Sequence, residues 1–145
     1  MRTIKYSKPV NINETKADAL IVYCSDFRFQ DQLHEVAKSF GVSYDLIAFG
    51  GASKAITDKS DVRELDEFLH SIHNYDQVMI FDHIRCGAFG PVEDEVRAHA
   101  ESFSRASDVI QHVRPGTPVS GFLFGVESAV EISYVPLNQP HPELA

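Results

Sequence analysis

The stretch DALIVYCSDFRF, residues 18–29, contains an apolar run that predicts a buried strand, followed by a segment with polar and charged residues. In residues 18–23 the apolar, β-forming residues run together instead of alternating with polar ones, which is typical of a strand covered on both faces of a sheet. Asp26 closes the strand, and apolar residues then recur at helical spacing from Phe29 to Phe40, before a stop at Gly41. The stretch therefore predicts the first strand–helix unit of a parallel sheet.

Strand and helix patterns alternate through the rest of the chain. Further strands are predicted at residues 43–49, 77–82, 119–124 and 128–135. Gly50-Gly51 is predicted to form a tight turn that lines a pocket. Helices are predicted after Ser60, with an apolar stripe to Ile72, and from Gly90-Pro91 to Pro115-Gly116, with Glu93, Asp94 and Glu95 in the first turn.

This alternation predicts an α/β fold. The expected sheet is mainly parallel, with four strands in the order 2-1-3-4, an antiparallel strand at one edge, and helices on both faces. No repeat, low-complexity segment or linker divides the sequence, so a single domain is expected over residues 1–145.

The composition narrows the classes of partner. The 145 residues carry a formal net charge of −8 without a cluster of Lys and Arg, which argues against binding to nucleic acid or to a membrane surface. No apolar stretch approaches the ~18 residues that span a bilayer, and the first residues lack the apolar segment of a signal peptide. We therefore expect a cytoplasmic protein. In a reducing compartment its two cysteines are more often metal-binding, catalytic or merely buried than disulfide-bonded.

Three potential metal ligands follow strands of the predicted sheet. Cys24 ends the first strand, while His83 and Cys86 come just after the third. Ligands collect at the carboxyl ends of such strands, so the three side chains converge if the first and third strands are neighbours. Two thiolates and one imidazole suit Zn²⁺. Closed structural zinc sites use four protein ligands, so a set of three indicates a position for water, whose pKa zinc lowers to about 7.

Asp26 and Arg28 lie beside the Cys24 ligand in the sequence. The Asp26 carboxylate is placed to accept a hydrogen bond from a hydroxide on the metal, and Arg28 to hold that carboxylate with a bidentate fork. The alternative interpretation is an acid at a helix N-terminus and a solvated surface base. For the cysteines, the alternatives are a small buried residue with a loop thiol, or a redox pair that leaves His83 unexplained.

The segments CSDFR (residues 24–28) and HIRCG (residues 83–87) resemble two linked motifs of the β-class carbonic anhydrases, Cys-x-Asp-x-Arg and His-x-x-Cys-Gly. The resemblance extends over residues 17–135 and implies reversible hydration of CO₂ to bicarbonate. It implies one Zn²⁺ per chain, held by Cys24, His83 and Cys86, and a catalytic dyad of Asp26 and Arg28. In some members of the family the aspartate becomes a fourth ligand, so Asp26 is a further candidate metal ligand.

The resemblance also carries expectations about substrate and assembly. Substrate contacts are expected at Gly87, Phe49 and Gly50. Members of this family generally pair, so a homodimer or a higher homo-oligomer is expected.

Two alternative functions stay open at this point. The sequence has Ile47-Ala48-Phe49-Gly50 where the family loop usually begins Arg-Asn before its Ala-Gly, and Asp82 where the family commonly has glycine before the histidine. The altered loop and an apolar site also fit a hydrolase of CS₂- or COS-like molecules on the same zinc. A non-catalytic relative is the other alternative, with Asp26 bound permanently as the fourth ligand of a closed site.

Overall fold

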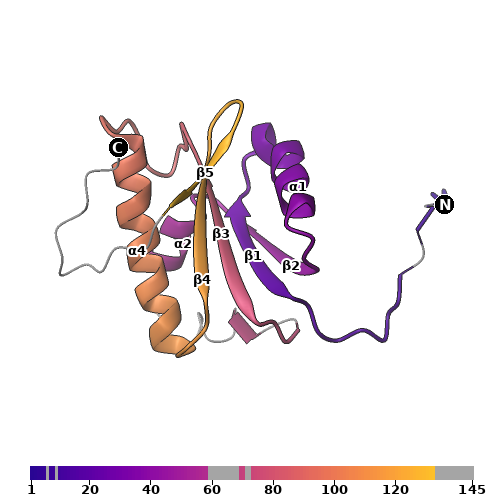
Figure 1. Cartoon of the computed structure of the whole chain (residues 1–145). Helices are drawn as coiled ribbons and strands as arrows, with labels where there is room; N and C mark the ends of the chain where they lie inside the picture. The colour runs from indigo at the N-terminus through magenta and orange to yellow at the C-terminus, as the bar shows by residue number, and fades with distance from the viewer. Residues whose placement is uncertain (6, 9, 59–68, 71–72, 133–145) are drawn as a thin grey trace.

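The computed structural model describes residues 1–132 except residues 6, 9, 59–68 and 71–72. In the described part, strands and helices alternate along the chain (Figure 1). Their order is β1 (Ala19–Cys24), a 3-10 helix η1 (Phe27–Phe29), α1 (Gln30–Ser39), β2 (Tyr44–Phe49), α2 (Ser53–Asp58), β3 (Gln77–His83), α4 (Glu95–Val113), β4 (Val119–Phe124) and β5 (Ala129–Ile132).

The strands form one five-stranded sheet in the order β2-β1-β3-β4-β5. β1 pairs in parallel with both β2 and β3, and β3 pairs in parallel with β4. β5 is antiparallel to β4. The predicted α/β fold, its strand order and its antiparallel edge strand are therefore confirmed.

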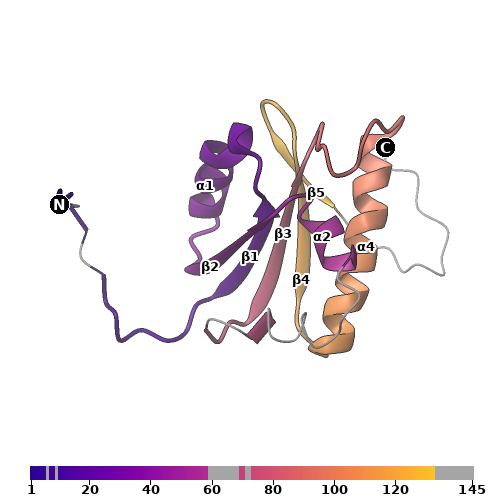
Figure 2. The same cartoon turned by 180° about the vertical axis from the view of Figure 1, so that it is seen from behind.

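Helices cover both faces of the sheet, with α1 on one side and α2 and α4 on the other (Figures 1 and 2). Successive side chains of a strand point to opposite faces. Leu20 and Val22 of β1 accordingly lie in the core beneath α2 and α4, whereas Ile21 lies in the core beneath α1. All three are at most 1% exposed, which explains why β1 is apolar throughout.

The helices and the edge strand differ from the sequence prediction at several points. α4 begins at Glu95 rather than at Gly90-Pro91, because the Asp94 side chain caps it by accepting from the Arg97 amide at 3.1 Å. Residues 53–58 form the unpredicted helix α2, directly after the Gly50-Gly51 turn. The helix predicted from Ser60 to Ile72 lies largely outside the described residues, as does the end of the strand predicted at 128–135.

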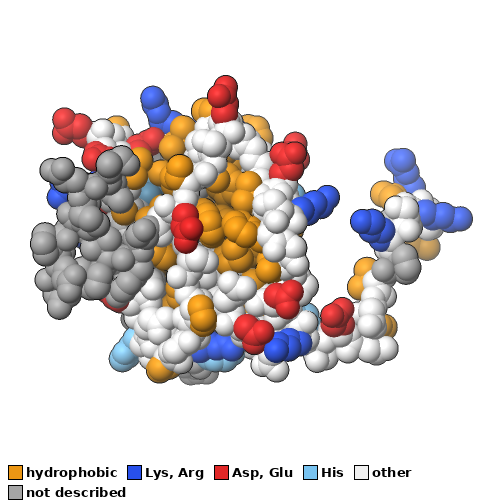
Figure 3. All heavy atoms as spheres, viewed as in Figure 1, with side chains coloured by type: hydrophobic (Ala, Val, Ile, Leu, Met, Phe, Trp, Pro, Cys, Tyr) orange, Lys and Arg blue, Asp and Glu red, His pale blue; other side chains and the backbone are white. Residues whose placement is uncertain are grey.

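The α1 side of the sheet leaves apolar surface exposed. Figure 3 shows hydrophobic side chains gathered over the strands between β5 and α1, with charged side chains around them. Phe40, just after α1, is 42% exposed, and Val130 of β5 is 51% exposed. Within the part of the chain that the structure describes, no helix is long and apolar enough to cross a membrane.

Gly121 in β4 marks the tightest contact between the sheet and α4. A Cβ built at Gly121 lies 2.5 Å from the ring of Phe103, which is only 1% exposed. We therefore expect Gly121→Ala to lower the free energy of unfolding by about 1–3 kcal/mol, because the core has no room for the methyl group. Chemical denaturation measures this. Gly50→Ala is the matched control, since a Cβ there meets no atom within 4 Å; an equal loss in both variants contradicts the explanation.

Candidate metal centre

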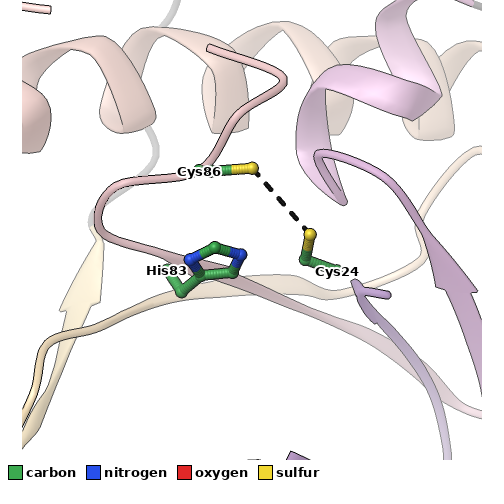
Figure 4. Close-up of side chains that lie close together, drawn as sticks. All are labelled: Cys24, His83 and Cys86. Carbon is green, nitrogen blue, oxygen red and sulfur yellow. Dashed lines mark hydrogen bonds between the residues drawn. The ribbon is translucent and has the colours of Figure 1, made fainter. Parts of the chain in front are cut away.

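Cys24, His83 and Cys86 lie together at the carboxyl edge of the sheet (Figure 4). Cys24 ends β1, His83 ends β3, and Cys86 follows in the loop after β3. Their candidate ligand atoms all lie within 4.8 Å of one another, and all three residues are buried. The convergence predicted from strand order is therefore what the structure shows, because β1 and β3 are neighbours.

Cys24 and His83 reach this edge from opposite faces of the sheet. Cys24 belongs to the core beneath α2 and α4. His83 instead stacks on Phe29 of η1, with ring centroids 4.3 Å apart. The metal centre thus lies across the end of the sheet, where loops from both faces meet, and this is the place where α/β sheets bind ligands.

The geometry of the two sulfurs fits a tetrahedral metal. The Sγ atoms of Cys24 and Cys86 are 3.8 Å apart, and both cysteines are free. Two thiolates on one tetrahedral Zn²⁺, each at about 2.3 Å, lie roughly 3.8 Å from each other. The sulfur positions therefore already match the spacing that zinc requires.

The imidazole of His83 is oriented for metal binding. Its Nδ1 donates to the carbonyl of Ile84 at 2.7 Å, which leaves Nε2 as the atom with the free lone pair. Nε2 is buried and has no hydrogen-bond partner among the described residues, and Oδ2 of Asp26 lies 3.6 Å from it. This nitrogen and the two cysteine sulfurs together form a set of ligands that suits zinc.

Hydrogen bonds favour a thiolate at Cys24 and a protonated thiol at Cys86. The Gly51 amide donates to the Cys24 sulfur at 3.4 Å. The hydrogen bond from Cys86 lowers the pKa of Cys24 and raises the pKa of Cys86, because the pair shares one proton. Burial alone would lower the pKa of His83, but its contacts with Cys24, Ile84 and Asp26 together raise it. Without a metal the pair therefore carries a single negative charge, on Cys24.

Asp26 and Arg28 form the predicted pair at the rim of the centre. Arg28 donates to Asp26 from Nε at 3.0 Å and from Nη2 at 2.6 Å, a bidentate contact. These bonds lower the pKa of Asp26 to about 2, so the side chain is a carboxylate at neutral pH. Both carboxylate oxygens of Asp26 are bonded to Arg28, and Asp26 is not part of the cluster of Cys24, His83 and Cys86. Its role as a fourth metal ligand stays a prediction.

A cavity of about 520 Å³ opens onto the centre. Gly50 and Gly87, both predicted to contact substrate, are among its lining residues, together with Asp26 and Arg28. Phe49, the third predicted contact, is not among them and packs against the core beneath α2 and α4. The substrate roles of these residues stay predictions.

A buried polar network beside the centre was not found from the sequence. Asp82 accepts from the Ser53 amide at 3.0 Å, from the Ser53 hydroxyl at 2.5 Å and from His99 Nδ1 at 2.8 Å. Ser102 extends the network to the Ser53 hydroxyl at 2.8 Å. His99 is 0% exposed. The available signal was Asp82 itself, an acid that directly follows the apolar run 78–81 of β3.

Fold and site together define an α/β protein with a Cys–His–Cys centre of the type that holds zinc. A family model described as "Putative carbonic anhydrase" matches residues 14–135, and the chain belongs to this family. An uncharacterized protein of Rickettsia conorii is 32% identical, over 82% of this chain and 73% of that protein. An uncharacterized protein of Rickettsia bellii is 28% identical, over 82% of this chain and 83% of that protein.

Solved carbonic anhydrases have the same fold at low sequence identity. The β-carbonic anhydrase isoform I of Trichomonas vaginalis aligns with a TM-score of 0.57 and 15% identity, over 86% of this chain and 87% of that one. The carbonic anhydrase of Glaciozyma antarctica aligns with a TM-score of 0.52 and 20% identity, over 79% of this chain and 81% of that one. The sheet order agrees with that of the β-class carbonic anhydrase fold.

Proposed function

We propose that this chain is a zinc-dependent carbonic anhydrase that hydrates CO₂ reversibly to bicarbonate. The observation that carries the proposal is the buried cluster of Cys24, His83 and Cys86, whose donor atoms lie within 4.8 Å of one another at a cavity rimmed by Asp26 and Arg28. Membership of the family supports the reaction class. When bound, zinc supplies a Lewis acid that activates water near neutral pH.

The chain's own residues supply binding and orientation. Asp26 is an acceptor held in one position by the bidentate contact with Arg28, and its Oδ2 lies 3.6 Å from the Nε2 of His83. A fixed carboxylate this close to the ligands accepts a hydrogen bond from the attacking water and sets its direction. Gly87, where a built Cβ meets no described atom within 4 Å, offers a backbone amide to a substrate oxygen.

The size and rim of the cavity suit a small substrate. CO₂ is neutral and linear, and it needs no charged recognition group, while the bicarbonate product is an anion. Arg28 stays 51% exposed at the rim, where its charge favours the approach of that anion. COS- and CS₂-like molecules are the alternative substrates for the same site, and activity assays separate the two substrate classes.

We expect Asp26→Ala to lower the kcat of CO₂ hydration by about a hundredfold while zinc content stays at one per chain, because orientation is lost and the three ligands remain. Stopped-flow hydration of CO₂ on the zinc-loaded protein measures this. Asp31→Ala is the matched control, since Asp31 is an exposed acid in the first turn of α1. Wild-type protein no faster than Asp26→Ala contradicts the proposal, and sulfide release from COS without CO₂ hydration reassigns the substrate.

A further inference from the structure

Arg85 lies between His83 and Cys86, in the loop after β3, and has an unusual backbone conformation. Its φ is +56°, in the left-handed region that side-chain-bearing residues rarely occupy. Within the described part of the chain only Ala52 shares this property among residues other than glycine. A conformation of this kind costs of order 1–3 kcal/mol and persists only where the surrounding structure holds it. Something must therefore hold Arg85 in place.

Two side chains hold the backbone of Arg85 from its two sides. The Arg85 amide donates to Oε1 of Glu95 at 2.6 Å. The Arg85 carbonyl accepts from Nη2 of Arg28 at 3.2 Å. Both are charge-assisted hydrogen bonds, which are roughly twice as strong as neutral ones. Arg28 already holds Asp26, so Glu95 is the contact dedicated to this loop.

Glu95 is well anchored for this purpose. It is the first residue of α4, next to the capping residue Asp94. One turn further on, His99 of the same helix is fully buried and bonded to Asp82, the residue before the His83 ligand. The start of α4 is therefore fixed relative to the end of β3. This places the Glu95 carboxylate against the loop that contains Arg85.

We infer that Glu95 is a positioning residue, whose carboxylate holds Arg85 in its left-handed conformation and thereby sets His83 and Cys86 at their spacing as ligands. The inference rests on the proposed function for the identity of the metal. The contacts that hold Arg85 are made by residues of the chain itself. Without Glu95, Arg85 relaxes toward negative φ, and this rotates Cys86 away from His83. Glycine at position 85 adopts the same φ without strain and removes the need for the carboxylate.

The test is the zinc dissociation constant, measured by competition with a chromophoric chelator. We expect Glu95→Ala to weaken zinc binding by about tenfold to a hundredfold, as for loss of a hydrogen bond to a charged group, and Glu95→Gln to fall in between. The double variant Glu95→Ala/Arg85→Gly is expected to regain most of the lost affinity. Glu95→Ala/Arg85→Ala is the matched control, because it removes the Arg85 side chain but keeps a Cβ, which makes a positive φ costly.

Hydrogen exchange of the Arg85 amide in the metal-free protein provides a second readout. We expect it to be at least about tenfold faster in Glu95→Ala than in wild type, because the protecting acceptor is gone. Glu93→Ala, an exposed acid two residues earlier, should change neither readout.

The outcomes separate this inference from the proposed function. Unchanged zinc affinity and unchanged exchange in Glu95→Ala overturn the inference, and so does failure of Arg85→Gly to restore affinity, since Glu95 then acts only by stabilising α4. Tight zinc binding without CO₂ hydration contradicts the proposed function and leaves the positioning role standing. A wild-type chain that takes up no zinc contradicts both.

Discussion

Replacement of His83 by alanine is expected to weaken zinc binding by about a hundredfold or more and to reduce CO₂ hydration to the level of the metal-free protein. A zinc site with few ligands derives roughly 3 kcal/mol or more from each of them, since total binding free energies at structural zinc sites run from about 10 to 16 kcal/mol. His83 is the sole nitrogen in the cluster, and its Nδ1 bond to Ile84 orients it for that purpose. Zinc per chain after dialysis against a chelator measures the loss.

The control for this variant is His34→Ala. His34 lies on the exposed side of α1, so its loss should leave zinc content unchanged. Cobalt substitution adds a spectroscopic check, because Co²⁺ bound by two thiolates gives intense sulfur-to-metal charge-transfer bands. His83→Ala should lose or shift these bands, whereas His34→Ala should retain them. Full zinc occupancy in His83→Ala would show that the metal is held elsewhere.

The second large effect concerns stability: Asp82→Ala is expected to lower the free energy of unfolding by at least about 3 kcal/mol. The carboxylate of Asp82 accepts three hydrogen bonds, two from Ser53 and one from His99, and all three residues are at most 2% exposed. Each buried donor left without an acceptor costs about 1–3 kcal/mol. Single domains have a free energy of unfolding of only about 5–15 kcal/mol, so this loss is a large fraction of the stability of the protein.

Chemical denaturation of the metal-free protein measures this effect without any contribution from zinc. Asp76→Ala is the matched control, because Asp76 pairs with Lys16 at 3.3 Å while both side chains are more than 60% exposed. Such surface pairs contribute about 0–1 kcal/mol. Asp82→Asn keeps the shape and one acceptor oxygen and should lie between the two. If Asp82→Ala is no less stable than Asp76→Ala, the network contributes little to the fold.

Asp82 and His83 are neighbours in the chain with different tasks. Because side chains alternate along a strand, Asp82 points toward α2 and α4, while His83 points toward η1 and stacks on Phe29. The end of β3 is consequently held from both faces of the sheet. This arrangement gives the buried acid Asp82 its hydrogen-bond donors.

Much of the sheet could be predicted from local sequence. β1 and β3 are buried on both faces, so β1 and residues 78–81 of β3 are continuous apolar runs and the pattern is clear. The beginning of α4 was predicted wrongly because two signals compete within a few residues. Gly90-Pro91 is a common helix opening, yet Gly90 has a φ of +65° and the chain becomes helical only after the Asp94 cap.

The three metal ligands could be proposed from the sequence because they come from two short segments. Cys24 ends an apolar run, and His83 and Cys86 are separated by only two residues. Strand order then brings the two parts together, since parallel neighbours end at the same edge. The stacking of Phe29 on His83 was missed, because Phe29 also fits the apolar stripe that predicts α1.

Short-range chemistry is thus enough to define the strands, the ligand spacing and the Asp26–Arg28 pair, since these depend on residues a few positions apart. The partners of Asp82 and the contact of Glu95 with Arg85 are of another kind. Ser53 and His99 lie 29 and 17 residues from Asp82, and Glu95 lies 10 residues from Arg85. Such contacts depend on how α2 and α4 pack on the sheet, and that packing is set by the whole core rather than by any one segment.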